Sequence, residues 1–237
     1  MAIKVKMTFG ISILFIALFM LSPFFHFTDI SVEGNLQIET EEILRRANLD
    51  RASNFFLFSP RRARRDIMEN YFIDHVGFRR TWPGTLEITV QERFLSGFIE
   101  YLDGMFLYID ENGRLLKVRS YVIEGLPKVT GLRPSQVHLG QLLEVDNPDA
   151  FSTVVIFAQL LNRHGLMETI SHIDVSDPEN TRVRLYSIEV YLGDTRGAHE
   201  KIMTLREIVN EWPVVRDARG FLDLRELDTE YIFRNLI

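Results

Sequence analysis

The chain has 237 residues and contains no cysteine. It therefore folds without disulfide bonds or thiolate metal sites, and its stability depends on an ordinary hydrophobic core. The apolar fraction of 46% is typical of globular chains. The net charge of -6 favours solubility and disfavours nucleic acid as a partner.

The sequence also lacks the motifs of common catalytic and nucleotide-binding sites. It has no GxSxG, no Walker loop, no GxGxxG and no HExxH. His172 and Asp174 share a face of an expected strand, which is typical of a solvated strand surface. No spacing selects one pair of carboxylates as acid and base. We therefore expect no enzymatic activity, no metal and no cofactor. The histidines, none of them at metal-ligand spacing, are His26, His75, His138, His164, His172 and His199.

Charged residues are missing from one long stretch, since no Asp, Glu, Lys or Arg lies between Lys6 and Asp29. The apolar run from Met7 to Phe27 has the length of a membrane span, which takes roughly 20 residues. A cleaved signal peptide is the first alternative, but the small-x-small cleavage site is missing and bulky aromatic residues stand in its place. A buried core helix is a further alternative, although few soluble helices are apolar on all faces.

The flanking charges predict an orientation. Lys4 and Lys6 precede the run, whereas only acidic residues follow it before Arg45. The positive-inside rule then places residues 1–6 in the cytoplasm as a stub, residues 7–27 in the membrane as an anchor, and the bulk outside the cell membrane.

Hydrophobic periodicity predicts a β-α-α-β-β order directly after this run. The turn signals are Glu33-Gly34-Asn35 and Pro83-Gly84, and the Ser59-Pro60 pair is an N-cap followed by a favoured first helical residue. The expected elements are a strand over 27–32, a helix from Thr40, a helix from Ser59 to about Asn70, and strands over 73–82 and 86–90.

The second half reads as a larger α+β domain with a mainly antiparallel sheet and two helices. Asp110 to Gly113 is expected to form a type I′ hairpin turn, and 126–131 is expected to be a loop. The best domain boundary is 94–97, so we predict domains over 28–94 and 95–237. The helices are expected from Asn147-Pro148 to Gly165 and from about Gly197 to a stop before Pro213; the strands are expected over 105–109, 115–118, 170–175, 182–186, 189–192, 220–225 and 230–235.

Two features are candidate binding surfaces. The basic cluster Arg61, Arg62, Arg64 and Arg65 is either a solvated helix face or a patch for acidic lipid or an acidic partner. The last strand carries Tyr231, Ile232 and Phe233, and a terminal strand is often an edge that can accept a partner strand. The alternative is an ordinary edge strand that buries alternate residues.

Several motifs follow one another in a fixed order along the chain. They are Val32-x-Gly34-Asn35, Arg80-x-Trp82-Pro83-x-x-Leu86-x-Ile88-x-Val90-x-Glu92-Arg93, Tyr108-Ile109-Asp110-x-x-Gly113, Leu126-Pro127-x-x-x-Gly131, Ile188-x-Val190-x-Leu192-Gly193, Glu200-Lys201-Ile202-x-x-Leu205 and Leu222-Asp223-Leu224-Arg225. In this order they resemble the bacterial cell-division proteins of the FtsQ/DivIB family. The chain departs from the family pattern at Leu95 and Gly97, where proline and alanine are usual, and after Arg225, where a glycine-containing turn is frequent.

The resemblance implies a POTRA domain followed by an FtsQ-type β domain in a non-enzymatic scaffold of the divisome, located in the cell inner membrane at the division septum. It implies binding of small bitopic partners, FtsB or DivIC and FtsL, and control of septal peptidoglycan synthesis. The implied partner-binding residues are Arg225, Glu230, Tyr231, Ile232, Phe233 and Arg234.

Two other functions remain open at this point. One is a POTRA-type component of outer-membrane assembly or transport, although only one such unit is visible and no run of barrel strands follows. The other is a membrane-tethered hydrolase of the cell wall.

Overall fold

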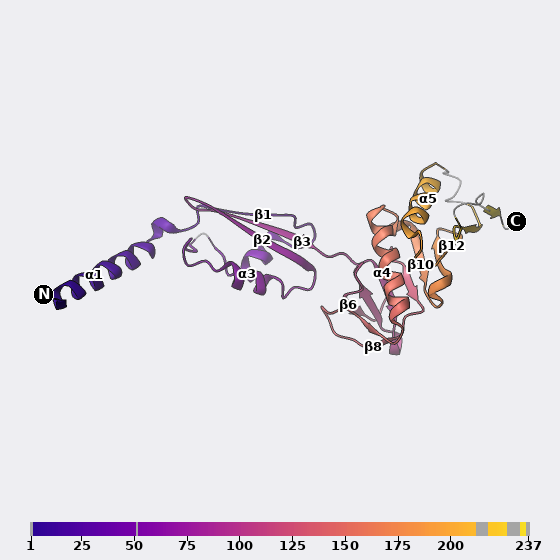
Figure 1. Cartoon of the computed structure of the whole chain (residues 1–237), viewed down its shortest axis with the longest axis horizontal. Coiled ribbons are helices and arrows are strands. Elements are labelled where there is room, and N and C mark those ends of the chain that lie inside the picture. The colour runs from indigo at the N-terminus through magenta and orange to yellow at the C-terminus, as the bar shows by residue number, and fades with distance from the viewer. Residues whose placement is uncertain (1, 51, 212–217, 227–232, 236–237) are drawn as a thin grey trace. The chain divides into compact units, whose positions relative to one another are not determined.

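The computed structural model describes residues 2–50, 52–211, 218–226 and 233–235 of the chain (Figure 1). The chain divides into two compact units, Met1–Arg93 and Phe94–Ile237. The fold is α+β, with mixed sheets in both units. The units are described separately below.

The first unit begins with helix α1 (Ala2–Met20). The helix ends within the apolar run that we expected to reach Phe27. Pro23, which cannot continue a helix, starts a short 3₁₀ helix (Pro23–Phe25), and the Ser22 hydroxyl caps it. Phe25 and Phe27 are buried, and Phe27 belongs to the core of the first unit. Among the residues that the structure describes, no helix has both the length and the hydropathy that a membrane span requires.

The predicted β-α-α-β-β order is confirmed. Strand β1 lies parallel to β3, and β2 pairs with β3 on its other side in antiparallel fashion. Ile43 and Ile67 from the two helices pack onto the inward side chains of the sheet, such as Ile88. The elements are β1 (Asp29–Glu33), α2 (Thr40–Arg46), α3 (Pro60–Ile67), β2 (Ile73–Thr81) and β3 (Thr85–Glu92).

The end of β3 is fixed by a buried carboxylate. Glu92 is 8% exposed, and its oxygens accept three backbone N–H bonds, from Leu36 (2.9 Å), Gln37 (2.9 Å) and Ile38 (3.0 Å). Because three donors converge on one charged group, the loop between β1 and α2 is held against the last strand. Nearby, Gly34 has a φ of 84°, and an added Cβ would lie 2.2 Å from the carbonyl oxygen of Val90.

The next residue fixes the other loop at this end of the sheet. The Arg93 Nη1 atom donates to the carbonyls of Tyr71 (3.2 Å) and Ile73 (2.6 Å), and its Nη2 atom pairs with Asp74. The Arg93 backbone N–H donates to Phe72 O (2.7 Å). The Glu-Arg pair of the sequence motif thus ties two separate loops to β3.

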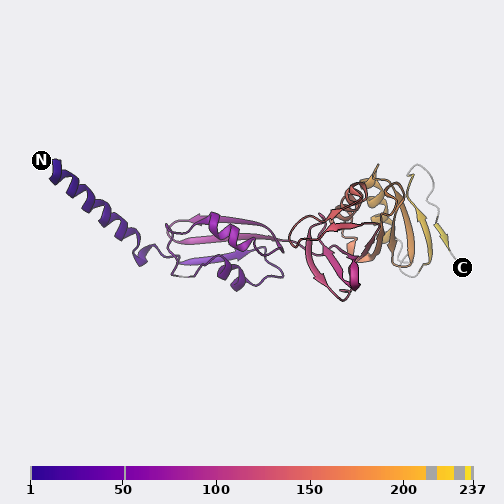
Figure 2. The ribbon, with the colours of Figure 1, turned by 90° about the horizontal axis from the view of Figure 1, so that it is seen from below.

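Within the described residues, nine strands of the second unit form one sheet in the order β14-β13-β12-β11-β10-β7-β4-β5-β6 (Figures 1 and 2). Apolar side chains of helices α4 (Pro148–Arg163) and α5 (Ala198–Glu211) bury one face of it in a single core. A small pair, β8 (Pro134–Gln136) and β9 (Glu144–Val145), lies outside this sheet. The nine strands are β4 (Gly97–Glu100), β5 (Phe106–Ile109), β6 (Leu115–Arg119), β7 (Lys128–Thr130), β10 (Ile170–Asp174), β11 (Thr181–Leu185), β12 (Ile188–Gly193), β13 (Gly220–Asp223) and β14 (Phe233–Asn235).

This sheet is mixed: among the described strands, five of its pairings are antiparallel, as the prediction of a mainly antiparallel sheet requires, and three are parallel. Strand β7 is parallel to both β10 and β4, and β12 is parallel to β13. The segment 126–131, which we expected to be a loop, contains β7 in the middle of the sheet. Strand β4, which begins at Gly97 where the expected boundary region ends, was also missed. Strand β4 buries three residues in a row and β7 buries only Val129, so neither strand shows the alternation by which strands are recognised.

The turn between β5 and β6 differs from the predicted type I′ turn, which needs positive φ at both central residues. Gly113 alone has a positive φ (77°) in this turn. Asp110 Oδ1 accepts the backbone N–H bonds of Asn112 (2.9 Å) and Arg114 (2.8 Å), so the side chain closes the turn instead. A Cβ at Gly113 would lie 2.3 Å from the ring of Phe151 on α4, which explains glycine in the motif.

We expect Glu92→Ala to lower the free energy of unfolding of the first unit by about 3 kcal/mol, because three backbone N–H groups lose a charged acceptor. Native-state hydrogen exchange of the β2 and β3 amides measures this unit separately from the second. Glu87→Ala on the same strand is the matched control. Its carboxylate lies 3.7 Å from Arg79 and is 41% exposed, so its loss should change stability by at most about 0.5 kcal/mol. Equal effects of the two variants would contradict the role of Glu92.

Candidate partner-binding surface

The candidate surface begins at one edge of the large sheet. Strand β14 pairs in antiparallel fashion with β13, with Leu222 opposite Phe233 and Phe221 opposite Arg234. Among the described residues, β13 is its one neighbour, so β14 is an edge strand. The predicted binding residues Glu230, Tyr231 and Ile232 lie outside the described residues, and for Phe233 and Arg234 the structure describes the strand alone.

Arg225, the remaining predicted residue, follows β13 and is held by Asp223. Its Nε atom donates to Asp223 Oδ1 (2.9 Å) and its Nη2 atom to Oδ2 (2.5 Å), a two-pronged pair. These bonds from Arg225 hold the pKa of the Asp223 carboxyl below its ordinary value. The Arg225 side chain is 50% exposed, so its guanidinium is oriented but accessible.

Tyr191 on β12 provides the platform beneath Arg225. The guanidinium carbon of Arg225 lies 5.5 Å from the centroid of the Tyr191 ring, and that of Arg182 lies 5.9 Å from it. Phe221 on β13 packs edge-on against the same ring at 5.9 Å. Gly193 leaves room for this arrangement, because a Cβ there would lie 3.0 Å from Arg225 Cγ.

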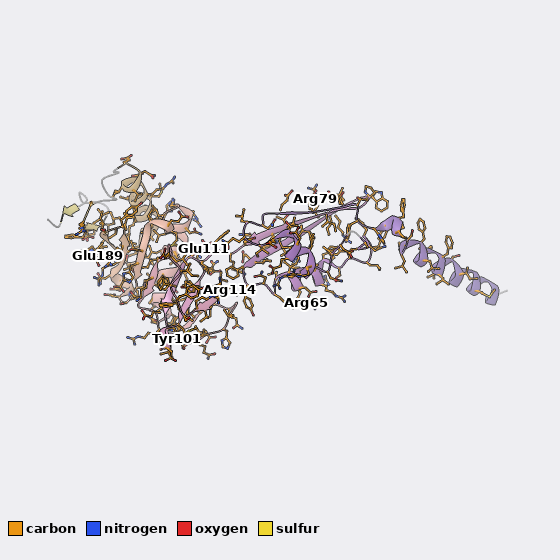
Figure 3. The ribbon with its side chains drawn as sticks, turned by 180° about the vertical axis from the view of Figure 1, so that it is seen from behind. Arg65, Arg79, Tyr101, Glu111, Arg114 and Glu189 are labelled. Carbon is orange, nitrogen blue, oxygen red and sulfur yellow. The ribbon has the colours of Figure 1, made fainter. Side chains whose placement is uncertain are left out.

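A charged network continues across the same face towards the middle of the sheet. Arg182 lies 3.4 Å from Glu189 (labelled in Figure 3) and 3.8 Å from Asp174. The buried residues Ile188, Val190 and Leu192 alternate with Glu189 and Tyr191 along β12. This face therefore lies opposite the one that α4 and α5 cover. Our sequence reasoning named Arg225 as a candidate and did not name Tyr191 or Arg182 beside it.

His172 and Asp174 share a face, as predicted, and both contact Thr130. The Thr130 hydroxyl lies 2.9 Å from His172 Nε2 and donates to Asp174 Oδ1 at 3.3 Å. Burial lowers the pKa of His172. Burial raises the pKa of Asp174, but hydrogen bonds from Ser176 and Thr130 outweigh it and lower that pKa overall. The hydroxyl here bridges the two other groups, whereas in a nucleophilic triad the histidine is the bridge.

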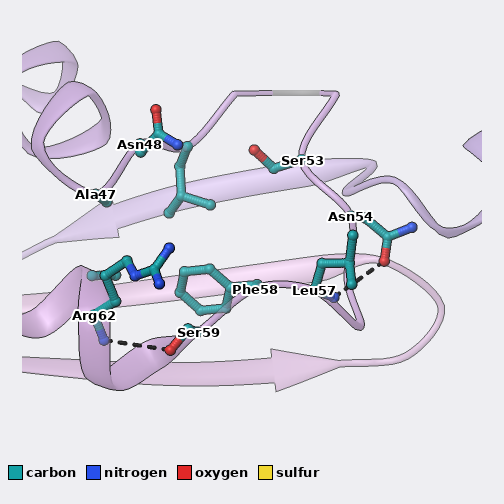
Figure 4. Close-up of a pocket in the computed structure, with 10 residues that line it drawn as sticks. Ala47, Asn48, Ser53, Asn54, Leu57, Phe58, Ser59 and Arg62 are labelled. Carbon is teal, nitrogen blue, oxygen red and sulfur yellow. Dashed lines mark hydrogen bonds between the residues drawn. The ribbon is translucent and has the colours of Figure 1, made fainter. Parts of the chain in front are cut away.

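Two arginines of the basic cluster of α3, Arg64 and Arg65, have structural partners. Arg64 Nε donates to Val76 O (2.9 Å) and its guanidinium lies 6.0 Å from the Phe78 ring, while Arg65 pairs with Asp66 at 2.7 Å. Arg62 lines a pocket of about 200 Å³ between the segments 47–49 and 53–63 (Figure 4). Among the described residues, no three His, Cys, Asp or Glu side chains form a group that could hold a metal ion.

Comparison with known proteins identifies both units. The POTRA domain of FtsQ type matches residues 25–93, and the C-terminal domain of cell division protein FtsQ/DivIB matches residues 99–225. The chain belongs to the FtsQ/DivIB family. The match to the C-terminal domain ends at Arg225, so Glu230 to Arg234 lie beyond it.

Relatives from several bacteria share most of the chain. Cell division protein DivIB of Clostridium acetobutylicum is 24% identical over 203 residues, covering 85% of this chain and 80% of that protein. DivIB of Clostridium botulinum (strain Loch Maree) is 25% identical over 94% of this chain and 86% of its own length. Cell division protein FtsQ of Rhizobium meliloti is 24% identical over 75% of this chain and 58% of its own length. A role in cell division follows for this FtsQ/DivIB protein.

We expect Arg225→Gln to raise the pKa of the Asp223 carboxyl towards its ordinary value of 3.8, as measured by carbon NMR during an acid titration. Because the folded-state pKa is depressed, the pair stabilises the protein above about pH 4, and this contribution is lost as pH falls through the folded-state pKa. Arg184→Gln is the control, since Arg184 is exposed on β11 and has no contact with Asp223. An unchanged Asp223 titration in Arg225→Gln would contradict the pairing.

Proposed function

We propose that this FtsQ/DivIB protein is a non-enzymatic, single-pass scaffold of the bacterial divisome. In this proposal it lies in the cell inner membrane at the septum, with its N-terminus in the cytoplasm and the two domains outside. It binds small bitopic division proteins, FtsB- or DivIC-like and FtsL-like, and so helps to control septal peptidoglycan synthesis.

The position of β14 is the observation that carries the partner-binding part. An edge strand presents N–H and C=O groups that a partner strand can pair with. Such β-augmentation gains affinity from the main chain and specificity from side chains beside the edge. Tyr191, Phe221 and the half-exposed Arg225 lie one or two strands from this edge and offer an aromatic and cationic surface. Large aromatic residues and arginine are the usual anchors of interfaces.

The membrane anchor in this proposal is α1 together with the residues that follow it. Exposed apolar side chains support it: Ile11, Ile13, Leu14, Phe15, Ile16, Leu18 and Phe19 are each more than half exposed. An apolar helix of this kind is stabilised when hydrocarbon covers it. Lys4 and Lys6 at its start favour a cytoplasmic N-terminus.

We expect Tyr231→Ala or Phe233→Lys to reduce recovery of the small bitopic partner at least about tenfold, because losing an interface anchor costs roughly 2 kcal/mol. The measurement is quantitative co-purification of the full-length chain from detergent-solubilised membranes. Tyr121→Ala is the matched control, since Tyr121 is 59% exposed and follows β6 at the opposite edge of the sheet. Unchanged recovery with both edge variants, while hydrogen exchange shows a folded domain, would rule out capture at this edge.

A further inference from the structure

Four large apolar side chains are exposed at one end of the first unit. Phe24 is 71% exposed, Phe56 44%, Leu57 67% and Trp82 56%. They come from three segments: the 3₁₀ helix after α1, the loop before α3, and the turn between β2 and β3. We refer to these four residues as the aromatic patch.

Ring contacts show that the aromatic patch is one surface. Three of its rings surround the buried ring of Phe25, with centroid distances of 5.2 Å for Phe24, 5.0 Å for Phe56 and 5.9 Å for Trp82. Phe55, in the same loop as Phe56, joins this loop to the turn: its ring lies 5.5 Å from Phe56 and 5.9 Å from Trp82. Leu57 follows Phe56 directly in the same loop. Contiguous exposed apolar patches on monomeric domains mark interaction sites.

The aromatic patch is continuous with the end of α1. Asn54 Nδ2 donates to the carbonyl of Met20, the last residue of the helix, at 2.8 Å. The Phe19 ring of the helix packs edge-on against Phe25 at 5.2 Å. The loop that carries Phe56 and Leu57 is thus attached to the C-terminal end of the exposed apolar helix.

Arginine lies at the border of the aromatic patch. The Arg80 guanidinium is 5.4 Å from the Phe55 ring, and its Nη1 atom donates to Phe55 O at 3.0 Å. Trp and Phe rings beside arginine are the composition that membrane–water interfaces favour, because rings enter the headgroup level while guanidinium groups meet lipid phosphates.

We propose that the aromatic patch inserts into the outer interfacial layer of the bilayer that α1 enters, and so docks the POTRA domain on phospholipid. This inference rests on the membrane anchoring proposed above, and it adds a second contact with lipid. The geometry favours lipid as the phase that covers the aromatic patch, because the patch begins where the apolar helix ends.

Trp82 can report this contact directly in the full-length chain, which has two tryptophans. In a Trp212→Phe background, Trp82 is the sole tryptophan. This protein is reconstituted into phosphatidylcholine–phosphatidylglycerol vesicles that carry bromine either near the headgroup or at the end of the acyl chain. We expect strong quenching of Trp82 fluorescence by the shallow bromine and weaker quenching by the deep bromine.

Two variants separate the aromatic patch from the rest of the unit. The triple change Phe24→Ser, Phe56→Ser and Leu57→Ser should abolish most of the quenching while the vesicles still carry the protein. Leu36→Ser removes a side chain that is 79% exposed in the same unit outside the aromatic patch, and it should leave the quenching unchanged. Hydrogen exchange of β2 and β3 amides verifies that each variant is folded.

Flotation of the vesicles on a density gradient tests anchoring separately. Protein that floats with unquenched Trp82 would overturn docking of the aromatic patch and leave the anchor standing. Protein that does not float would overturn both. A blue-shifted Trp82 emission that bromine does not quench would mean that a second copy of the chain covers the patch, and this result also contradicts the proposal.

Discussion

The first unit depends on one buried carboxylate and the guanidinium beside it. A three-stranded sheet with two short helices has a small core, and without cysteine it has no covalent support. Glu92 satisfies three backbone donors of the loop before α2, and Arg93 satisfies carbonyls of the segment before β2. These hydrogen bonds attach both loops to the C-terminal end of β3. These bonds fix the positions of the strands at one end of the sheet. The turn that carries Trp82 lies at the other end.

The large sheet of the second unit has two chemically different faces. Helices α4 and α5 bury the apolar face, whereas the other face holds aromatic rings, arginines and carboxylates in contact with one another. Because the ionic groups share partners across three strands, the side chains are oriented before any partner arrives. Preorganised groups lose less entropy when they bind. Such a face suits a protein whose family functions in cell division.

Prediction from the sequence succeeded where a periodic pattern was long enough. Helix α4 and strand β3 have clear periods and were found nearly to the residue, whereas β4 and β7 show no alternation of buried and exposed residues. The parallel pairing of β7 with two distant strands is a tertiary property that no local pattern contains. At the candidate site, Arg225 was recognised from a motif. The stacking of Arg225 on Tyr191 could not be read from the sequence, because it depends on the parallel register of β12 and β13 and on the space above Gly193. The turn at Asp110 was misread, since a side chain replaces the backbone geometry that Asn-Gly suggests.

Strand β7 has a mechanical consequence. It joins the β4–β6 part of the sheet to the β10–β14 part through three residues, with two register pairs on one side and three on the other. A strand captured at β14 by a partner under tension would pull across the strands, in the direction of their hydrogen bonds. A force in this direction separates the strands of a sheet one pair at a time. The pair that shares the fewest hydrogen-bonded residues separates first. Under the proposed capture at β14, the ladder between β7 and β4, which has two register pairs, would therefore be the first part of this sheet to open.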